Sequence, residues 1–416
     1  MKGVGFIRDA KIRAGLAITG NERIGNRDFD MLLTTGNFYN GVNGTGLSAR
    51  LANPGIKWEE TVQKNIGVDL SFLNGRLTLT TDFYIKDTRG LLANQPLPAE
   101  TGLENVRVNL GNVQNKGFEA ALQAIPYQSG DFRWKTNFNI SRNTVKVKKM
   151  AGGVPVIGAN HITQEGMPLG SFFGYRILGV FPYDQSNAFT PQGERLDPKF
   201  ENGNFVSYEL DGKAYSGAVK QISVGGVVSK GGDFYWKDND GNFVIDGQDR
   251  EILGNPYPKY YGGFRNEFTY KNFSFSFLFD FQFDVQVYNN FMQWTSQLRA
   301  NALTPIPYVL ENFWQGPGDQ DAIFPGFVRR NQNQLGETAP TSYWIEDADY
   351  IKLRNVKLSY AFSGPLLKKA GMSLLTVYTA LNSPLVWTNY RGVDPELNAD
   401  NNTTLSAGVD MSRYPR

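Results

Sequence analysis

The sequence has no cysteine, and its 416 residues include one histidine, His161. The absence of cysteine excludes a disulfide framework, iron–sulfur clusters and zinc sites built from cysteine. One histidine excludes a histidine-rich metal site, and no Gly-x-Ser-x-Gly motif offers His161 a nucleophilic serine partner. The formal net charge is +2, so composition gives no basis for binding nucleic acid, and we expect no nucleic-acid partner.

Long hydrophobic runs are also missing. No stretch of 18 apolar residues occurs, which excludes a transmembrane helix. This does not exclude a membrane β-barrel, because alternating strands average out in any hydropathy sum. The opening residues MKGVGFIRDA lack the sustained apolar region of a secretory signal peptide. A membrane barrel is therefore compatible with this start only if the chain is a fragment.

What the sequence does have is strong alternation. From Phe273 to Val287 every odd position is apolar, and the even positions are mostly Ser, Asp or Gln. A period of two predicts a β-strand with one apolar and one polar face. A strand of this length, tilted by about 45°, rises roughly 35 Å and crosses a bilayer. Taken alone, it fits either a lipid-facing barrel wall or a long strand of a soluble β-sandwich.

The connections between alternating segments favour the barrel. Tight turns at residues 73–75, 128–130 and 271–272 alternate with long connections, and Asn74-Gly75 is a strong hairpin signal. Outer-membrane barrels show this asymmetry, with short periplasmic turns and long external loops. We therefore predict an all-β fold, the C-terminal part of a transmembrane antiparallel β-barrel. Its strands are predicted at about residues 4–18, 57–72, 76–90, 112–127, 131–148, 257–270, 273–290, 349–363 and 374–387.

Two further expectations come from this strand pattern. Nine strands that end on the external side cannot close a barrel, because single-chain barrels have an even strand number and open edges cannot face lipid. We therefore expect residues 1–416 to be a barrel portion without its last strand. In addition, the alternation slips by one residue after Leu353, which predicts a β-bulge around Arg354–Asn355.

Several short motifs follow one another in a fixed order along the chain. They are NPGIKWE at 53–59, NIGVD at 65–69, PLP at 96–98 with TG at 101–102, NKGFE at 115–119, GD at 232–233, DGQDR at 246–250, GNP at 254–256, YIKLRNV at 350–356 and DPE at 394–396. Together these motifs resemble those of the SusC/RagA family, the TonB-dependent outer-membrane transporters of Bacteroidetes. The resemblance covers essentially the whole chain.

The resemblance implies a complete protein larger than this chain. Its barrel would have about 22 strands, and the signal peptide and plug domain that precede the barrel in the family are absent here. It implies import of large nutrients, oligosaccharides or peptides, through the outer membrane, with a SusD-like surface lipoprotein as partner. TonB would supply energy through the missing plug. The implied protein lies in outer-membrane lipid, is not an enzyme and requires no cofactor.

Two rival hypotheses remain open at this stage. A secreted or surface β-rich module could bind glycans or act as an adhesin without transport, but it would not require tight turns at one end of its strands only. An outer-membrane enzyme would need a nucleophile–histidine pair or a carboxylate pair on the barrel wall. Asp280 and Asp284 share a strand face but lie roughly 13 Å apart, too far for paired-carboxylate glycoside hydrolysis.

One segment has the ligand spacing of a calcium loop. Oxygen-bearing side chains occur at relative positions 1, 3, 5, 9 and 12. They are Asp238, Asp240, Asn242, Asp246 and Asp249. Against a structural calcium ion, position 6 is Phe243 where such loops have glycine, and position 12 is Asp instead of Glu. The alternative is an Asp/Asn/Gly turn that is stabilised by its own side-chain hydrogen bonds.

Aromatic residues gather in the predicted external loops. Trp236, Trp314, Tyr343 and Trp344 are candidate platforms for sugar rings or peptide side chains. The alternative interpretation is packing of long loops on one another, or a girdle at the lipid interface for aromatics near strand ends.

Overall fold

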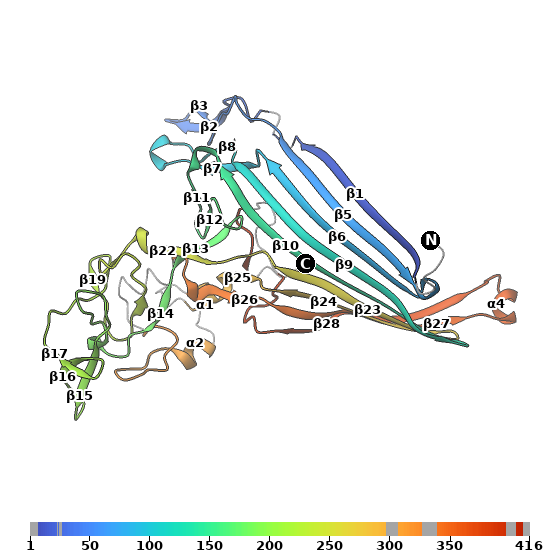
Figure 1. The fold of residues 1–416 in the computed structure, drawn as a ribbon. Helices are drawn as coiled ribbons and strands as arrows, with labels where there is room; N and C mark the ends of the chain where they lie inside the picture. Colours follow the sequence, from blue (N-terminus) through green and yellow to red (C-terminus); the bar gives the residue numbers. More distant parts are fainter. Residues whose placement is uncertain are drawn as a thin grey trace.

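The structure, a computed structural model, describes residues 7–22, 24, 27–296, 307–326, 339–396 and 405–410. Its largest element is an antiparallel sheet of nine strands, each paired with its neighbours in chain order. The strands are β1 (Ile7–Asn21), β5 (Glu59–Phe72), β6 (Leu77–Arg89), β9 (Gly111–Ser129), β10 (Phe132–Met150), β23 (Tyr260–Tyr270), β24 (Phe273–Phe283), β27 (Tyr350–Phe362) and β28 (Leu375–Thr388). Figure 1 shows them as long, tilted, side-by-side ribbons.

The nine predicted barrel strands are confirmed over the described residues, with shifts of up to three residues at their ends and one larger correction, while residues 4–6 of the first predicted strand lie outside the described residues. The predicted strand 273–290 is too long, because β24 ends at Phe283. Asp284 then takes a positive φ of 59°, which breaks the extended backbone. The chain continues as β25 (Gln286–Asn289), which pairs outside the large sheet with β26 (Ile345–Asp347) and β29 (Val409–Asp410).

One face of the large sheet is largely apolar. In the strand register, Phe138 lies opposite Phe264, which in turn lies opposite Phe279. At the β1 edge, Ile12 is 76% exposed and Leu16 is 70% exposed. Each such side chain in water would forgo about 1.5–3 kcal/mol of burial. The face is therefore suited to lipid, as the alternation predicts.

A polar side chain on this apolar face has its hydrogen bond supplied internally. Asn266 is almost fully buried among aromatic rings, and the indole N–H of Trp134 donates to its Oδ1 at 2.8 Å. Trp134 also stacks on Phe268, with ring centroids 5.7 Å apart. Because hydrocarbon offers no hydrogen-bonding partner, this pairing keeps the amide compatible with a lipid-facing surface.

The opposite face carries charge. On it, Arg13 of β1 donates hydrogen bonds of 2.8–3.0 Å to Asp69 of β5 and to Asp82 of β6. These hydrogen bonds link the three strands. The guanidinium lies across Gly67, where a Cβ atom would collide with Arg13 and Asp82. An apolar face on one side and ion pairs on the other are what a barrel wall between lipid and a wet lumen requires.

The two ends of the sheet differ in the way predicted. At one end the connections are tight, and Asn74, Gly130 and Lys271 take the positive φ of 50–55° that such turns need. The connection between β27 and β28 at this end is longer and holds the short helix α4 (Pro365–Lys369). Long connections leave the other end (Figure 1). Among the described helices, none is long and apolar enough to cross a membrane.

The predicted β-bulge is confirmed. Arg354 is skipped in the pairing of β27 with β24 and again in its pairing with β28. Opposite it, Ser383 takes a positive φ of 48°. A bulge re-aims side chains and bends the strand, and here it leaves Arg354 directed toward charged partners on the lumen face.

The long connections fold into smaller sheets and helices. Their strands are β2 (Leu33–Tyr39), β3 (Val42–Leu47), β4 (Arg50–Leu51), β7 (Leu92–Pro96), β8 (Asn105–Asn109), β11 (Val156–Ile157), β12 (His161–Thr163), β13 (Ser171–Tyr175), β14 (Ile177–Val180), β15 (Asp197–Glu201), β16 (Asn204–Leu210), β17 (Lys213–Tyr215), β18 (Ser223–Val224), β19 (Val227–Val228), β20 (Phe234–Trp236), β21 (Val244–Ile245) and β22 (Arg250–Gly254). Their helices are α1 (Asn290–Thr295) and α2 (Pro307–Asn312). We call the described parts of residues 156–349 that lie outside β23 and β24 the loop body.

Candidate functional site

The loop body has two aromatic cores. The first gathers Trp236 and Phe234 of β20 with residues such as Ile177 of β14. The second gathers Trp344 with residues from α1, α2 and β25. Tyr343 packs against both cores, so the segment that carries Tyr343 and Trp344 joins them. These cores explain why such long connections fold instead of remaining extended.

This packing corrects the assignment of Trp236 and Trp344 as substrate platforms. Trp236 is 0% exposed and Trp344 is 2% exposed, so neither ring can stack on a ligand in this conformation. Tyr343 is largely enclosed, and burial raises the pKa of its hydroxyl well above the usual range. The structure favours the alternative that the sequence left open, in which these aromatics pack long loops on one another.

Trp314 is partly exposed but is also held in place by neighbours. Its indole N–H donates to the carbonyl of Pro182 at 3.3 Å. The ring lies so close to Gly232 and Gly326 that a Cβ atom at either position would meet it within 3.0 Å. Trp314 therefore remains a candidate for ligand contact through its exposed part, and that role stays a prediction.

The predicted calcium segment forms a compact acidic turn. Ligand oxygens of Asp238, Asp240 and Asp249 all lie within 4.8 Å of one another. Asp246 is outside this group, because its side chain caps a short 3₁₀ turn by accepting from the N–H of Gln248 at 2.7 Å. Asn242 uses its Oδ1 to accept from the N–H of Val244 at 2.6 Å. The structure thus brings three of the four predicted carboxylate ligands together, with Asn242 beside them through its Nδ2, which donates to Asp240 Oδ2 at 2.9 Å.

The missing glycine at position 6 of this segment is no obstacle to the turn. Phe243 itself takes a φ of 64°, and Gly241 takes 75°. Asp238 supports this backbone by accepting from the N–H groups of Gly241 at 2.8 Å and Phe243 at 2.7 Å. The turn is therefore stabilised by side-chain hydrogen bonds of the kind that the alternative interpretation requires.

The cluster also affects the protonation of Asp240. The pKa of Asp240 is raised above its ordinary value, first by desolvation and then by Asp238 and Asp249 beside it. A divalent cation is the group that would relieve this repulsion, since hard cations prefer clustered carboxylate oxygens.

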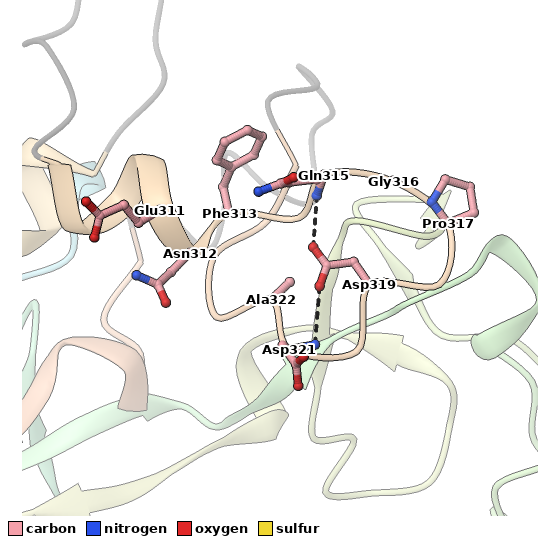
Figure 2. Close-up of a pocket in the computed structure, with 9 residues that line it drawn as sticks. All are labelled: Glu311, Asn312, Phe313, Gln315, Gly316, Pro317, Asp319, Asp321 and Ala322. Carbon is pink, nitrogen blue, oxygen red and sulfur yellow. Dashed lines mark hydrogen bonds between the residues drawn. The ribbon is translucent and has the colours of Figure 1, made fainter.

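A polar cavity lies beside α2. It has a volume of about 440 Å³ and is lined by Glu311, Asn312, Phe313, Gln315, Gly316, Pro317, Asp319, Asp321 and Ala322. Figure 2 shows Asp319 at the centre of the loop that encloses it. Its carboxylate accepts from the N–H groups of Gln315 at 3.0 Å and Asp321 at 3.2 Å. The lining offers carboxylates and amides for hydrogen bonds to a polar ligand.

A second charged cluster lies where β27 meets the segment after β28. Lys352 Nζ is 3.1 Å from Asp394 Oδ2 and 2.5 Å from Glu396 Oε2. Arg354 pairs with both Asp280 and Glu396. Burial alone would raise the pKa of Glu396, but hydrogen bonds from Arg354, Lys352 and Tyr350 outweigh it and lower this pKa to about 2.

The sequence alone does not reveal this cluster as a unit. The alternation predicts Asp280 on the polar face of its strand, the slip in the pattern predicts a bulge around Arg354–Asn355, and the Asp394-Pro395-Glu396 motif stands far from both in the sequence. The one signal in the sequence is the bulge at a charged residue, because bulges often occur next to functional sites and redirect a side chain there. His161 lies elsewhere, in the loop body: its Nε2 is 2.9 Å from the carbonyl oxygen of Ala407, and its ring packs on Phe172.

The sheet, its two faces and its unequal ends define the class of protein, an outer-membrane β-barrel wall. Residues 19–247 match the family described as "TonB dependent receptor-like, beta-barrel". The match covers more than half of the chain. The chain therefore belongs to this family of outer-membrane receptors.

Named relatives agree with this assignment. The chain is 41% identical over 418 residues to TonB-dependent receptor P39 of Formosa agariphila, covering 100% of this chain and 40% of that protein. It is 25% identical over 432 residues to TonB-dependent receptor SusC of Bacteroides thetaiotaomicron, covering 100% of this chain and 37% of that protein. The chain thus spans well under half the length of these relatives.

A solved structure shares the fold. The RagAB peptide importer in its closed-closed state aligns with a TM-score of 0.73 and 21% identity, over 100% of this chain and 40% of that chain. The expected resemblance to SusC- and RagA-like receptors is confirmed, together with the β-barrel fold and the outer-membrane location.

Proposed function

We propose that the protein containing this chain imports large nutrients, oligosaccharides or peptides, through the outer membrane with energy from TonB. The observation that carries this proposal is the sheet itself, with an apolar outer face, a charged inner face and elaborated loops at one end only. Relatives named as TonB-dependent receptors, and the structural likeness to a peptide importer, support it. In this proposal TonB would act through a plug domain, and the chain itself spans 40% of the length of the relative TonB-dependent receptor P39.

We further propose a SusD-like surface lipoprotein as partner, which would cover the external loops. The support is the likeness to SusC and to the RagAB complex. The folded loop body offers a preformed surface for such a partner, because its two cores fix long connections that would otherwise be mobile. A surface of this kind needs about 1,200–2,000 Å² of total buried area for a stable complex.

A transport assay tests this function. Cells that express the native protein are given fluorescently labelled pools of peptides and of oligosaccharides, with a strain lacking TonB as control. We expect uptake of one pool that disappears without TonB, and co-purification of a surface lipoprotein with the tagged protein. Uptake that is equal with and without TonB would contradict energised import, and binding at the cell surface without internalisation would favour the adhesin hypothesis.

We also propose that the acidic turn at residues 238–249 holds a structural calcium ion. Asp238, Asp240 and Asp249 would be its carboxylate ligands, and Val244 would supply a backbone carbonyl as position 7 does in such loops. The ion would neutralise carboxylates that now raise the pKa of Asp240. Since the turn is already hydrogen-bonded, the ion would add to its stability without creating its shape.

Calorimetric titration of the native protein with Ca²⁺ is expected to show saturable binding that is lost in the Asp238→Asn/Asp240→Asn variant. An Asp321→Asn variant, which changes an exposed carboxylate elsewhere in the loop body, should bind as before. Binding should weaken as the pH falls through the raised pKa of Asp240, because the protonated carboxyl is a poor ligand. The same heat in the parent and the double variant would exclude this site.

A further inference from the structure

The segment that follows β28 is held both by the small sheet of β25, β26 and β29 and by β27 of the large sheet. At its start, Thr388 Oγ1 donates to the carbonyl of Asp349 at 2.7 Å. The hydroxyl group of Tyr390 donates a hydrogen bond to Asp410 Oδ2 at 2.6 Å. The guanidinium of Arg391 forms an ion pair with Glu346 Oε1 at 2.9 Å. We call residues 388–396 the strap.

The far end of the strap is held by charge. Lys352 on β27 is 5% exposed, and its described hydrogen bonds go to Asp394 and Glu396 of the strap. Arg354 donates to Glu396 at 2.6 Å, and Tyr350 donates to it at 2.8 Å. A buried ammonium is tolerated only with close anions. The strap carboxylates therefore stabilise Lys352 in the wall, and Lys352 in turn holds the strap.

The strap also covers apolar side chains. Tyr390 packs with Val285, Val287 and Ala348 in a small buried cluster, and Ala348 has no exposed surface. If the strap left the wall, Tyr390 would leave with it and Ala348 would meet solvent. Exposure of residue 348 therefore reports whether the strap is in place.

The charges of this cluster do not balance. Two cations, Lys352 and Arg354, face three carboxylates, those of Asp280, Asp394 and Glu396. The carboxylates repel one another. The side chains of Asp394 and Glu396 are a third and a quarter exposed, and that of Arg354 is 36% exposed. A soluble carboxylate can therefore reach Arg354 first, and Lys352 once the strap carboxylates have moved.

We propose that Lys352 and Arg354 form an anion site in the lumen wall, which the strap carboxylates fill and which a carboxylate-bearing ligand can take over, releasing the strap. An acidic sugar or a peptide with a free C-terminus has this chemistry. The inference is independent of TonB-driven import, because it concerns only how the strap is held, and its test reads strap release without any transport step.

The test uses the native protein in lipid with the substitution Ala348→Cys, in a chain that otherwise has no cysteine. Maleimide labelling is followed by mass spectrometry of the peptide that contains residue 348. We expect slow labelling in this parent and at least ten-fold faster labelling when Asp394→Asn and Glu396→Gln are added. The matched control is Glu209→Gln/Asp211→Asn, which removes two carboxylates at the same spacing and one ion pair, with Lys199, and should leave the rate unchanged.

A second arm needs no change of charge in the protein. Sodium acetate is compared with sodium chloride at the same ionic strength, and acetate is expected to raise the labelling rate of the Ala348→Cys parent several-fold more. Lys352→Arg, which keeps the cation, should retain slow labelling in chloride. Equal rates in acetate and chloride would overturn the exchangeable anion site. An unchanged rate after both strap carboxylates are removed would show that Tyr390 and Arg391 hold the strap without them.

Discussion

Trp236→Ala is expected to destabilise the loop body by about 3–5 kcal/mol, the usual cost of truncating a fully buried aromatic side chain. The ring is enclosed by the first aromatic core, with Tyr175 at 5.7 Å edge-to-face and Phe234 at 5.9 Å. Removing it leaves a cavity that the surrounding strands cannot fill without moving. The large sheet should be little affected, because its strands are paired independently of this core.

Native-state hydrogen exchange in lipid measures this effect. The amides of β14 and β20, which pair across Ile177 and Trp236, should exchange faster by two to three orders of magnitude, which corresponds to about 3–4 kcal/mol at about 1.4 kcal/mol per factor of ten. The matched control is Trp294→Ala. Trp294 is 56% exposed, and its loss should change the opening free energy by no more than about 0.5 kcal/mol.

Trp236→Phe separates packing from any role of the indole nitrogen. Among the described residues, Trp236 Nε1 has no hydrogen-bond partner, so phenylalanine keeps most of the apolar ring and removes an unsatisfied donor. We expect Trp236→Phe to cost clearly less than Trp236→Ala. Equal losses for the two variants would mean that the N–H has a partner in the native protein, and the packing interpretation would then need revision.

The barrel strands were predictable because their environment repeats at short range. A strand between lipid and water alternates every two residues, and each strand pairs with the next one along the sheet. The pattern even revealed the bulge, since Leu353 and Val356 both need the apolar face and Arg354 is the extra residue between them. The end of β24 at Phe283 was missed because Val285 and Val287 continue the alternation while being buried in the loop body instead.

The loop aromatics were not predictable in the same way. Trp236 shares its core with Ile177 and Tyr343 from distant parts of the chain, and no local pattern encodes such packing. A tryptophan in a polar loop has the same appearance whether it stacks on a ligand or fills a core. The strap has the same difficulty, because Glu396 is an ordinary loop carboxylate until the fold places it beside Lys352 and Arg354.

The acidic turn lies between these cases. Residue spacing correctly brought Asp238, Asp240 and Asp249 together, because a tight turn within twelve residues is a local structure. Spacing could not say that Asp246 would cap a 3₁₀ turn, nor that Phe243 would take the backbone conformation usually left to glycine. Metal loops and hydrogen-bonded Asp/Asn turns use the same residues, so the pattern alone does not separate them.

Gly174→Ala is expected to separate the two cores of the loop body. Gly174 lies in β13, and a Cβ atom there would be 2.7 Å from the carbonyl carbon of Pro340 and closer still to its oxygen. That carbonyl accepts from the N–H of Tyr175 at 2.9 Å. Because the obstacle is backbone, it can be relieved only by moving the segment from Pro340 onward, which carries Tyr343 and Trp344 into the cores.

The expected cost is that of overpacking, about 1–3 kcal/mol or more, concentrated where the two segments meet. Hydrogen exchange should show lost protection at the N–H of Tyr175 and at the N–H of Ile177, which donates to Ser342 Oγ at 3.0 Å. Gly316→Ala is the control, since a Cβ there meets no atom within 4 Å. Both glycines have ordinary backbone angles, so a difference between them isolates the steric contact from backbone strain. Unchanged protection at Tyr175 in Gly174→Ala would mean that residues 340–344 do not dock on β13 in the native protein, and the two cores would then be joined in some other way.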